Sequence, residues 1–353
     1  MHTACSDQYI LAGDIGGTKS LLLLAQLDGK RLKPLYQRRY LSAAYADIHT
    51  MLDDFCTRAG LSAPPHIACL ALAGPVESLE EDDTQAQLTN LPWCLQGSVI
   101  AQQSGIAKVV LLNDFAAIAH ALDALEEEQH CTLQSGKPPL RGTRLILGAG
   151  TGLGVCIVPP GCARQALSTE SGHAGFAPAD AQQQRLWSYI FAQEGRCTRE
   201  HVLSGQGIVR IAQFLRTQGE SASPALEAAL AQSSADPAAV LSEFALQHQE
   251  RLAYKSLALF ARIYGSLAGD LALSCLPFGG VYIAGGIAPK ILPLLQEDNR
   301  FIQAFADKPP MTHLLTQMPV AVILDTAIGL RGAAHFAANL SRNASGNAEL
   351  RPT

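Results

Sequence analysis

Gly13-Asp14-Ile15-Gly16-Gly17-Thr18 is the segment of this sequence that is most informative about the fold. It lies between the apolar runs 9–12 and 21–24, so it predicts two strands joined by a glycine turn. Glycines let the backbone approach a polyphosphate with successive N–H groups pointing at it, and Thr18 adds a hydroxyl donor. A carboxylate at a strand end, here Asp14, can hold Mg²⁺, usually through water. The alternative for this stretch alone is a plain hairpin turn, because short motifs are weak indicators.

The same pattern returns later in the chain. The apolar run 145–147 leads into Gly148-Ala149-Gly150-Thr151-Gly152-Leu153-Gly154, and a further apolar run follows. A third glycine pair, Gly285-Gly286, ends the strand-like run 281–284. Recurrence at this long spacing indicates a duplicated domain plan and not a short-period repeat. Three glycine elements together favour nucleotide binding over plain turns.

Two common nucleotide motifs do not fit these turns. A Walker A loop needs Gly-Lys-Ser/Thr in that order, whereas Lys19 follows Thr18 here. A dinucleotide fingerprint needs G-x-G-x-x-G at the start of a helix. The residue three positions after Gly150 is a leucine, and the residue three positions after Gly152 is a valine. The glycine turns therefore indicate a different nucleotide-binding fold.

Length and composition limit the class of protein. A chain of 353 residues suits two domains, and 48% hydrophobic with 16% charged residues allows a large core. The mild net charge of −5 argues against a nucleic-acid partner. Nine scattered cysteines without a C-x-x-C pair are typical of reduced thiols and not of a zinc site. Charged residues interrupt the apolar run 253–276, and residues 1–7 form no apolar leader, so we expect a cytoplasmic protein without a membrane span.

Four polar residues are candidates for binding the phosphate acceptor. Asn113 and Asp114 stand where a buried strand-like run stops and a helix-like pattern, 115–127, begins. This place suits a carboxylate that positions a hydroxyl and accepts its proton late, but it also suits a helix cap. Glu170 and His173 lie in a Ser/Gly loop and can hydrogen-bond sugar hydroxyls; the alternative is a solvated loop pair.

The remaining polar patterns carry less information. Glu-x-x-His, a motif of di-iron helix bundles, occurs at 127–130 and at 170–173. The first copy lies next to an expected helix end and the second lies in a loop. A metal centre is therefore rejected. Glu200 alone is uninformative, and the alternative to a functional role is a charge on a helix face. The acidic run 77–83 predicts a solvated loop, and the Ala/Ser-rich run 219–235 predicts a surface connection.

Six motifs, taken in order, resemble the bacterial glucokinase family of the actin–Hsp70–hexokinase superfamily over residues 9–340. They are the turn at 13–18, Leu-Asn-Asp-Phe at 112–115, Gly-Ala-Gly-Thr-Gly-Leu-Gly at 148–154, Glu-Ser-Gly-His-Ala-Gly-Phe-Ala-Pro at 170–178, Glu-His-Val-Leu-Ser-Gly at 200–205 and Phe-Gly-Gly-Val-Tyr-Ile-Ala-Gly-Gly-Ile at 278–287. Each motif is weak alone, and the ordered set is highly specific.

The resemblance implies an α/β protein with the two-lobed, ribonuclease-H-like fold of actin and hexokinase and an interdomain cleft. It implies a small domain at 1–113 and a large domain at 114–330. A C-terminal helix at about 331–345 would pack back on the small domain, and 346–353 would be a loose tail. A cytoplasmic homodimer is the habit of the family.

The resemblance also implies an activity and the residues that carry it. A glucokinase transfers the γ-phosphoryl group of ATP to the 6-hydroxyl of glucose, with Mg²⁺ at Asp14. Asp114 would be the base for that hydroxyl and would hold the sugar together with Asn113. The remaining hydroxyls would be bound by Glu170, His173 and Glu200. ATP would lie across the glycine elements, with its adenosine near Gly285 and Gly286. The residues that would bind ATP are Gly13, Asp14, Ile15, Gly16, Gly17, Thr18, Gly150, Thr151, Gly152, Gly285 and Gly286.

Three features depart from the family pattern: Lys19 stands where many members carry a small polar residue, Ser171 replaces a glycine, and the acidic run 77–83 is longer. They leave open a kinase for another hexose or an amino sugar. A further alternative is a non-catalytic nucleotide switch of the same superfamily, which would lack the sugar-binding set. Sugar kinases related to transcriptional repressors are disfavoured, because the cysteine-rich zinc motif after His173 is missing.

Overall fold

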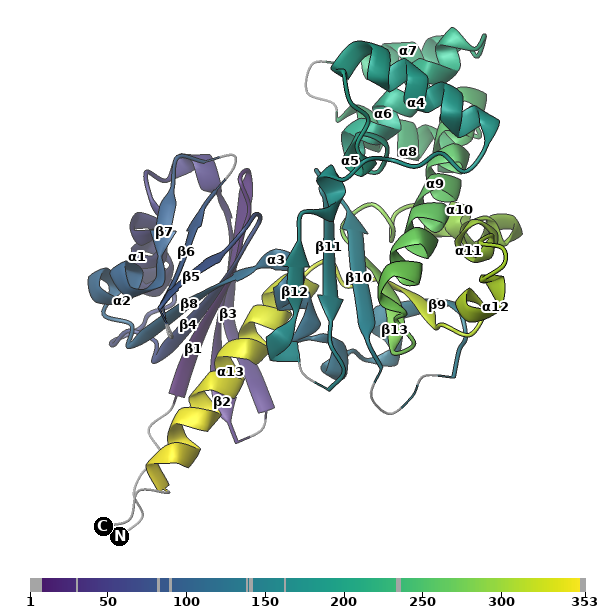
Figure 1. Ribbon diagram of the computed structural model, residues 1–353. Helices are drawn as coiled ribbons and strands as arrows, with labels where there is room; N and C mark the ends of the chain where they lie inside the picture. Colours follow the sequence, from purple (N-terminus) through teal and green to yellow (C-terminus); the bar gives the residue numbers. More distant parts are fainter. Residues whose placement is uncertain are drawn as a thin grey trace. The chain divides into compact units, whose positions relative to one another are not determined.

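The computed structural model describes residues 8–29, 31–80, 83–88, 91–137, 139, 142–161, 163–232 and 236–349. The chain divides into two compact units (Figure 1). Unit 1 comprises Met1–Leu125 and Ala327–Thr353, and unit 2 comprises Glu126–Thr326. The division thus falls after Leu125, beyond the boundary expected after 113. The expected C-terminal helix is α13, Ile328–Glu349, which includes the start of the expected tail; residues 350–353 of that tail lie outside the described residues.

Unit 1 is built on a five-stranded sheet in the order β3-β2-β1-β4-β8. The β3/β2 and β2/β1 pairs are antiparallel, whereas the β1/β4 and β4/β8 pairs are parallel. Every residue of β4 is buried, as expected for a parallel strand covered on both faces. The strands are β1 Gln8–Ile15, β2 Lys19–Asp28, β3 Arg31–Leu41, β4 Ile67–Leu72 and β8 Lys108–Asn113.

Helices cover both faces of this sheet, so alternate strand residues enter two separate cores. On one face, α1 (Ile48–Arg58) and α2 (Gly97–Ser104) pack with Leu11 and Leu70. On the other face, α3 (Asp114–Ala119) and α13 pack with Ile10 and Cys69. The helix expected near the C-terminus therefore closes the core of unit 1, although it begins more than 200 residues after the end of α3 in the sequence.

Unit 2 repeats this plan. Its sheet has the order β12-β11-β10-β13-β14-β9, in which the first three strands are antiparallel neighbours and β10, β13 and β14 are parallel. Antiparallel β9 is added at the far edge. The predicted duplicated plan and the α/β, actin/hexokinase-type fold class are confirmed. The strands are β9 His130–Gln134, β10 Arg144–Ala149, β11 Leu153–Val158, β12 Leu167–Thr169, β13 Gly280–Ala284 and β14 Val320–Ile323.

The central helix of unit 2 is α9, Arg251–Cys275. Among the described residues it is the one helix long and apolar enough to cross a membrane, but 78% of its apolar window is buried inside the protein, as in a core helix. A Cβ at Gly265 or Gly269 would lie 2.1 or 2.3 Å from a backbone oxygen of α11, so both glycines allow close helix packing. The other helices are α4 Ala181–Glu194, α5 Arg199–Val202, α6 Gly205–Thr217, α7 Pro224–Leu230, α8 Pro237–Leu246, α10 Leu292–Gln296, α11 Arg300–Ala306 and α12 Thr312–Leu315.

The helix expected at 115–127 is shorter than predicted. It ends at Ala119, and two 3₁₀ turns, Leu122–Ala124 and Glu127–Gln129, follow. A capping box between Glu126 and Gln129 satisfies the first backbone groups of the second turn. Since a capping box starts a new helical segment, the chain does not continue as one helix.

Two expected loops contain regular structure. The run 219–235 includes α7, where Ser223 accepts a hydrogen bond from the N–H of Leu226 and a proline occupies the first turn, a typical helix start. The acidic run 77–83 enters a three-stranded sheet formed by β5 (Glu77–Glu80), β6 (Asp83–Gln87) and β7 (Cys94–Gln96), with residues 81–82 outside the described residues. The Asp83 carboxylate accepts hydrogen bonds from Gln96 and Ser98, which lower its pKa and join this sheet to α2.

The closest approach of α13 to α3 gives a prediction for stability. A Cβ at Gly332 would lie 1.8 Å from the carbonyl oxygen of Ala117, and no side-chain rotation can relieve an overlap with backbone. We expect Gly332→Ala to lower the free energy of unfolding by about 2 kcal/mol, measured by urea titration. The control is Gly329→Ala on the same helix, where the nearest atom would be 3.7 Å away. Equal unfolding free energies for both variants would contradict this packing.

Candidate functional site

The first glycine turn connects β1 to β2 in unit 1. The N–H of Gly16 donates to the carbonyl oxygen of Lys19 at 3.1 Å, and a Cβ at Gly16 would lie 2.8 Å from that oxygen, so the turn requires glycine here. The side chains of Thr18 and Lys19 are exposed. Ile15 is fully buried in the core and can offer a ligand only its main-chain atoms. The turn therefore presents backbone and one hydroxyl to solvent, as a phosphate loop does.

Two buried serines hold this turn from behind. The Ser42 hydroxyl donates to the carbonyl oxygen of Gly16 at 2.7 Å, and the hydroxyls of Ser42 and Ser20 are 2.9 Å apart. The N–H of Ser42 donates to the carbonyl oxygen of Thr18 at 3.0 Å. Sequence reasoning missed both serines, because a contact between residues 26 positions apart leaves no local pattern.

Asn113 and Asp114 lie where β8 ends and α3 begins, also in unit 1. Asn113 is the N-cap: its Oδ1 accepts from the N–H groups of Phe115 and Ala116 at 3.0 and 3.1 Å, and its Nδ2 donates to Gly74 at 3.0 Å. Asp114 is the first helical residue, and its Oδ1 accepts from the N–H of Phe115 at 2.9 Å. The capping role that the sequence left open for Asp114 therefore belongs to Asn113.

Asp14 and Asp114 both lie near Gly329, which is at the start of α13. A Cβ at Gly329 would lie 3.7 Å from Oδ2 of Asp14 and 4.0 Å from the carbonyl oxygen of Asp114. Burial raises the pKa of the Asp14 carboxyl, and among the described residues none forms an ion pair with it. A half-buried carboxylate without a cation fits a metal ligand. Among the described residues, no group of three or more His, Cys, Asp or Glu side chains could hold a metal ion. Water or phosphate oxygens would therefore supply the other ligands of a Mg²⁺ ion at Asp14, as Mg²⁺ prefers.

The second glycine turn connects β10 to β11 in unit 2 and is held by two helices. The N–H of Gly150 donates to the carbonyl oxygen of Gly152 at 2.8 Å, and the carbonyl oxygen of Gly150 accepts from Gly205, the first residue of α6, at 2.9 Å. The fully buried Tyr264 on α9 accepts through its hydroxyl from the N–H of Ala149 at 3.0 Å. The side chain of Thr151 at the tip is exposed.

The third glycine pair packs directly against this turn. Gly285 has φ of +82°, and a Cβ there would lie 2.6 Å from the carbonyl oxygen of Ala149. Only glycine combines that backbone conformation with so close an approach. Gly286 beside it is exposed. The structure therefore brings together, within unit 2, the predicted nucleotide residues Gly150, Thr151, Gly152, Gly285 and Gly286.

Glu200 contacts the second glycine turn. Its Oε2 accepts from the N–H of Leu153 at 2.9 Å, and a Cβ at Gly152 would lie 2.5 Å from that oxygen. Glu200 is thus half-buried against the second turn, so its carboxylate is not simply a solvated charge on a helix face. Gly172 packs on the same strand, since a Cβ there would lie 2.3 Å from the carbonyl oxygen of Leu153.

Glu170 and His173 flank Gly172 at the 3₁₀ turn η5, Ser171–His173. Their carboxylate Oε2 and imidazole Nε2 are 3.9 Å apart, and the side chains are 62% and 64% exposed. Because η5 contacts both β11 and α5, these two residues and Glu200 belong to one region of unit 2. The predicted residues thus form two sets. Unit 1 carries Gly13, Asp14, Ile15, Gly16, Gly17, Thr18, Asn113 and Asp114, and unit 2 carries the others.

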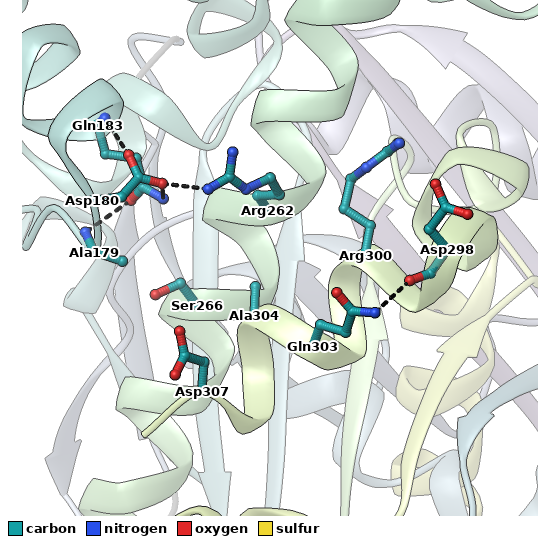
Figure 2. Close-up of a pocket in the computed structure, with 10 residues that line it drawn as sticks. All are labelled: Ala179, Asp180, Gln183, Arg262, Ser266, Asp298, Arg300, Gln303, Ala304 and Asp307. Atoms are coloured by element: carbon teal, nitrogen blue, oxygen red, sulfur yellow. Dashed lines mark hydrogen bonds and ion pairs between the residues drawn. The ribbon is translucent and has the colours of Figure 1, made fainter. Parts of the chain in front are cut away.

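A hollow of about 500 Å³ in unit 2 contains none of the predicted residues. Its walls come from the start of α4, from α9 and from α11 (Figure 2). Its two arginines are matched by carboxylates: Arg262 pairs with Asp180, and Arg300 pairs with Glu297 at 3.0 Å. A polyphosphate would compete with these carboxylates, so the glycine elements are the better candidate site.

Comparisons with known proteins agree with these motifs. The glucokinase family model matches residues 11–340. A glucokinase of Nostoc sp. is 40% identical over 345 residues, covering 94% of this chain and 99% of the relative. The crystal structure of a glucokinase from an Antarctic psychrotroph has a TM-score of 0.78 and 29% identity, covering 94% of this chain and 99% of that one.

A more distant structure shares the fold alone. It is a glucokinase of the ROK family from Streptomyces griseus in complex with glucose and AMPPNP, with a TM-score of 0.63, 21% identity and coverage of 94% and 99% of the two chains. The family model includes both glycine turns and the segments around Asp114 and Glu200, and the Nostoc relative covers 94% of this chain. This chain belongs to the glucokinase family.

Proposed function

We propose that this chain is a glucokinase, which transfers the γ-phosphoryl group of ATP to the 6-hydroxyl of glucose and releases glucose 6-phosphate and ADP. The observation that carries the proposal is the contact between Glu200 and the second glycine turn. Family resemblance assigns this carboxylate to a sugar hydroxyl and this turn to ATP. One short segment therefore holds acceptor and donor together, as a phosphotransferase requires.

The roles of the other residues follow from their chemistry. Asp114 accepts the proton of the 6-hydroxyl, and its place in the first turn of α3 favours the charged form of the carboxylate. Asn113, Glu170 and His173 bind sugar hydroxyls together with Glu200, since carboxylates accept hydrogen bonds and an amide or imidazole can donate or accept. Asp14 holds Mg²⁺, which neutralises charge on the phosphates when bound.

The nucleotide is held by main-chain N–H groups of the glycine elements and by Thr18. The complex of the Streptomyces griseus glucokinase with glucose and AMPPNP supports ATP as the donor and glucose as the acceptor. We also propose that the protein is a cytoplasmic homodimer, as the resemblance to bacterial glucokinases implies. Exposed Lys19, at the start of β2, lies outside this set of roles.

A sugar panel tests the proposed function. The purified protein is incubated with Mg-ATP and glucose, mannose, fructose, glucosamine or N-acetylmannosamine, and ADP release is compared with a reaction without sugar. We expect the highest kcat/KM with glucose, because a site that hydrogen-bonds each hydroxyl discriminates between sugars strongly. A preference for another sugar would favour a different hexose kinase. ADP release that no sugar stimulates would favour a nucleotide switch.

The serines behind the first turn give a prediction about ATP. Ser42→Ala removes the hydroxyl that donates to Gly16, so the phosphate loop loses one of its supports. We expect a roughly fivefold increase in KM for ATP with little change in KM for glucose, measured by initial rates. The control is Ser256→Ala, an equally buried serine whose hydroxyl donates to a carbonyl within α9. Equal KM values for ATP in both variants would remove Ser42 from this role.

A further inference from the structure

The loop that carries Glu170 and His173 is paired with the segment that precedes Glu200. The N–H of Arg199 donates to the carbonyl oxygen of Ala174 at 2.9 Å, and the N–H of Phe176 donates to the carbonyl oxygen of Cys197 at 3.1 Å. Between these bonds, Gly175 and Thr198 form an antiparallel bridge. The backbone thus links Glu170, His173 and Glu200, the members of the proposed sugar-binding set that lie in unit 2.

Two arginine side chains make additional contacts with η5. Arg196 Nη2 donates to the carbonyl oxygen of His173 at 2.8 Å. Arg199 Nη1 donates to the hydroxyl of Ser171, and it lies 3.5 Å from the carbonyl oxygen of the same residue. Among the described residues neither guanidinium forms an ion pair, so both charges are directed at η5. Hydrogen bonds from charged donors are about twice as strong as those between neutral groups.

The contact depends on the hydroxyl at position 171. A glycine at this position would have no side-chain oxygen to accept the bond from Arg199. Ser171 lies directly after Glu170 and two residues before His173. A bond at this point therefore restricts the rotation of the loop on which both sugar-binding candidates stand.

We propose that Arg199, acting through Ser171, is a positioning residue that sets the selectivity for glucose over its epimers. The proposal rests on the proposed function, because it concerns the orientation of Glu170 and His173 toward sugar hydroxyls. Epimers differ in the direction of one hydroxyl, so discrimination requires donors and acceptors in fixed positions. The Arg199–Ser171 contact fixes these positions without touching the sugar.

A double-mutant cycle tests the inference. Ser171→Gly, Arg199→Met and the double variant are compared with the unaltered protein for kcat and KM with glucose and mannose and for KM with ATP. We expect each single change to raise KM for glucose about tenfold and to reduce the preference for glucose over mannose by a similar factor. KM for ATP should stay constant, and the double variant should be no worse than Arg199→Met alone.

Controls separate positioning from general damage. Arg185→Met removes an exposed arginine of α4 and should leave every constant unchanged. Ser171→Gly leaves Arg199 in place, so it tests the contact separately from any loss of folded protein in Arg199→Met. Unchanged selectivity in Ser171→Gly, or additive losses in the double variant, would overturn the inference while the proposed function stands. An unaltered protein that phosphorylates no sugar would instead overturn the proposed function itself.

Discussion

Asp114→Asn should lower kcat for glucose phosphorylation by about 10³-fold while glucose still binds. Asparagine has the same shape as aspartate and keeps an oxygen that can accept the bond from the N–H of Phe115, which is 2.9 Å long. The start of α3 should therefore keep its geometry. The amide cannot take up the proton of the attacking hydroxyl, and it carries no charge to favour proton loss. The loss should consequently appear in kcat and not in the affinity for the sugar.

Two measurements check this prediction: steady-state kinetics for kcat, and calorimetric titration with glucose for binding. Asp53→Asn on the exposed face of α1 is the matched control and should retain full activity. Asp114→Ala should be at least as inactive. A variant of Asp114 that keeps a tenth or more of the turnover would exclude this carboxylate as the base.

Asp14→Asn should have two opposite effects. Without a carboxylate to hold Mg²⁺ near the phosphates, kcat/KM for ATP should fall about 10²-fold. The protein without nucleotide should instead become more stable near neutral pH, because burial disfavours the charged carboxylate. A substitution that damaged the fold would lower both activity and stability. A fall in kcat/KM together with a rise in stability would therefore identify Asp14 as a functional residue that destabilises the protein.

The pH dependence of that stability follows from the direction of the pKa shift. The folded pKa of Asp14 lies above its unfolded value, so the folded state binds more protons between the two values. Stability therefore decreases as the pH rises through this window, and the advantage of Asp14→Asn should grow over the same window and then stay constant. Urea titrations at a series of pH values measure it, with Asp28→Asn at the exposed end of β2 as the control. An advantage independent of pH would contradict the assignment to the Asp14 carboxylate.

The sequence was most informative where burial is complete. β4 is buried on both faces and reads as one apolar run, and α9 is buried along most of its length. β3 was missed, because it is an edge strand with mostly exposed residues and includes Pro34, and its pairing with β2 comes from backbone hydrogen bonds. The acidic strand β5 was missed for the same reason: charged residues give no apolar alternation.

The site shows the same division between local and distant information. Glycine turns and the Asn113–Asp114 pair are local motifs, so their positions at strand ends could be predicted. The groups that hold them come from elsewhere in the chain: Ser42 for the first turn, Tyr264 for the second and Arg199 for η5. Such tertiary contacts have no fixed spacing in the sequence. The one available signal was Ser171, whose departure from the family glycine marks the place that Arg199 contacts.

The most direct test of the central claim is the identity of the phosphorylated product. The purified protein is incubated with Mg-ATP and glucose, and the reaction is followed by phosphorus NMR. The proposed function predicts that glucose 6-phosphate appears at the same rate as ADP and that Asp114→Asn slows the appearance of both by about 10³-fold. ADP accompanied by inorganic phosphate, without a sugar phosphate, would contradict it.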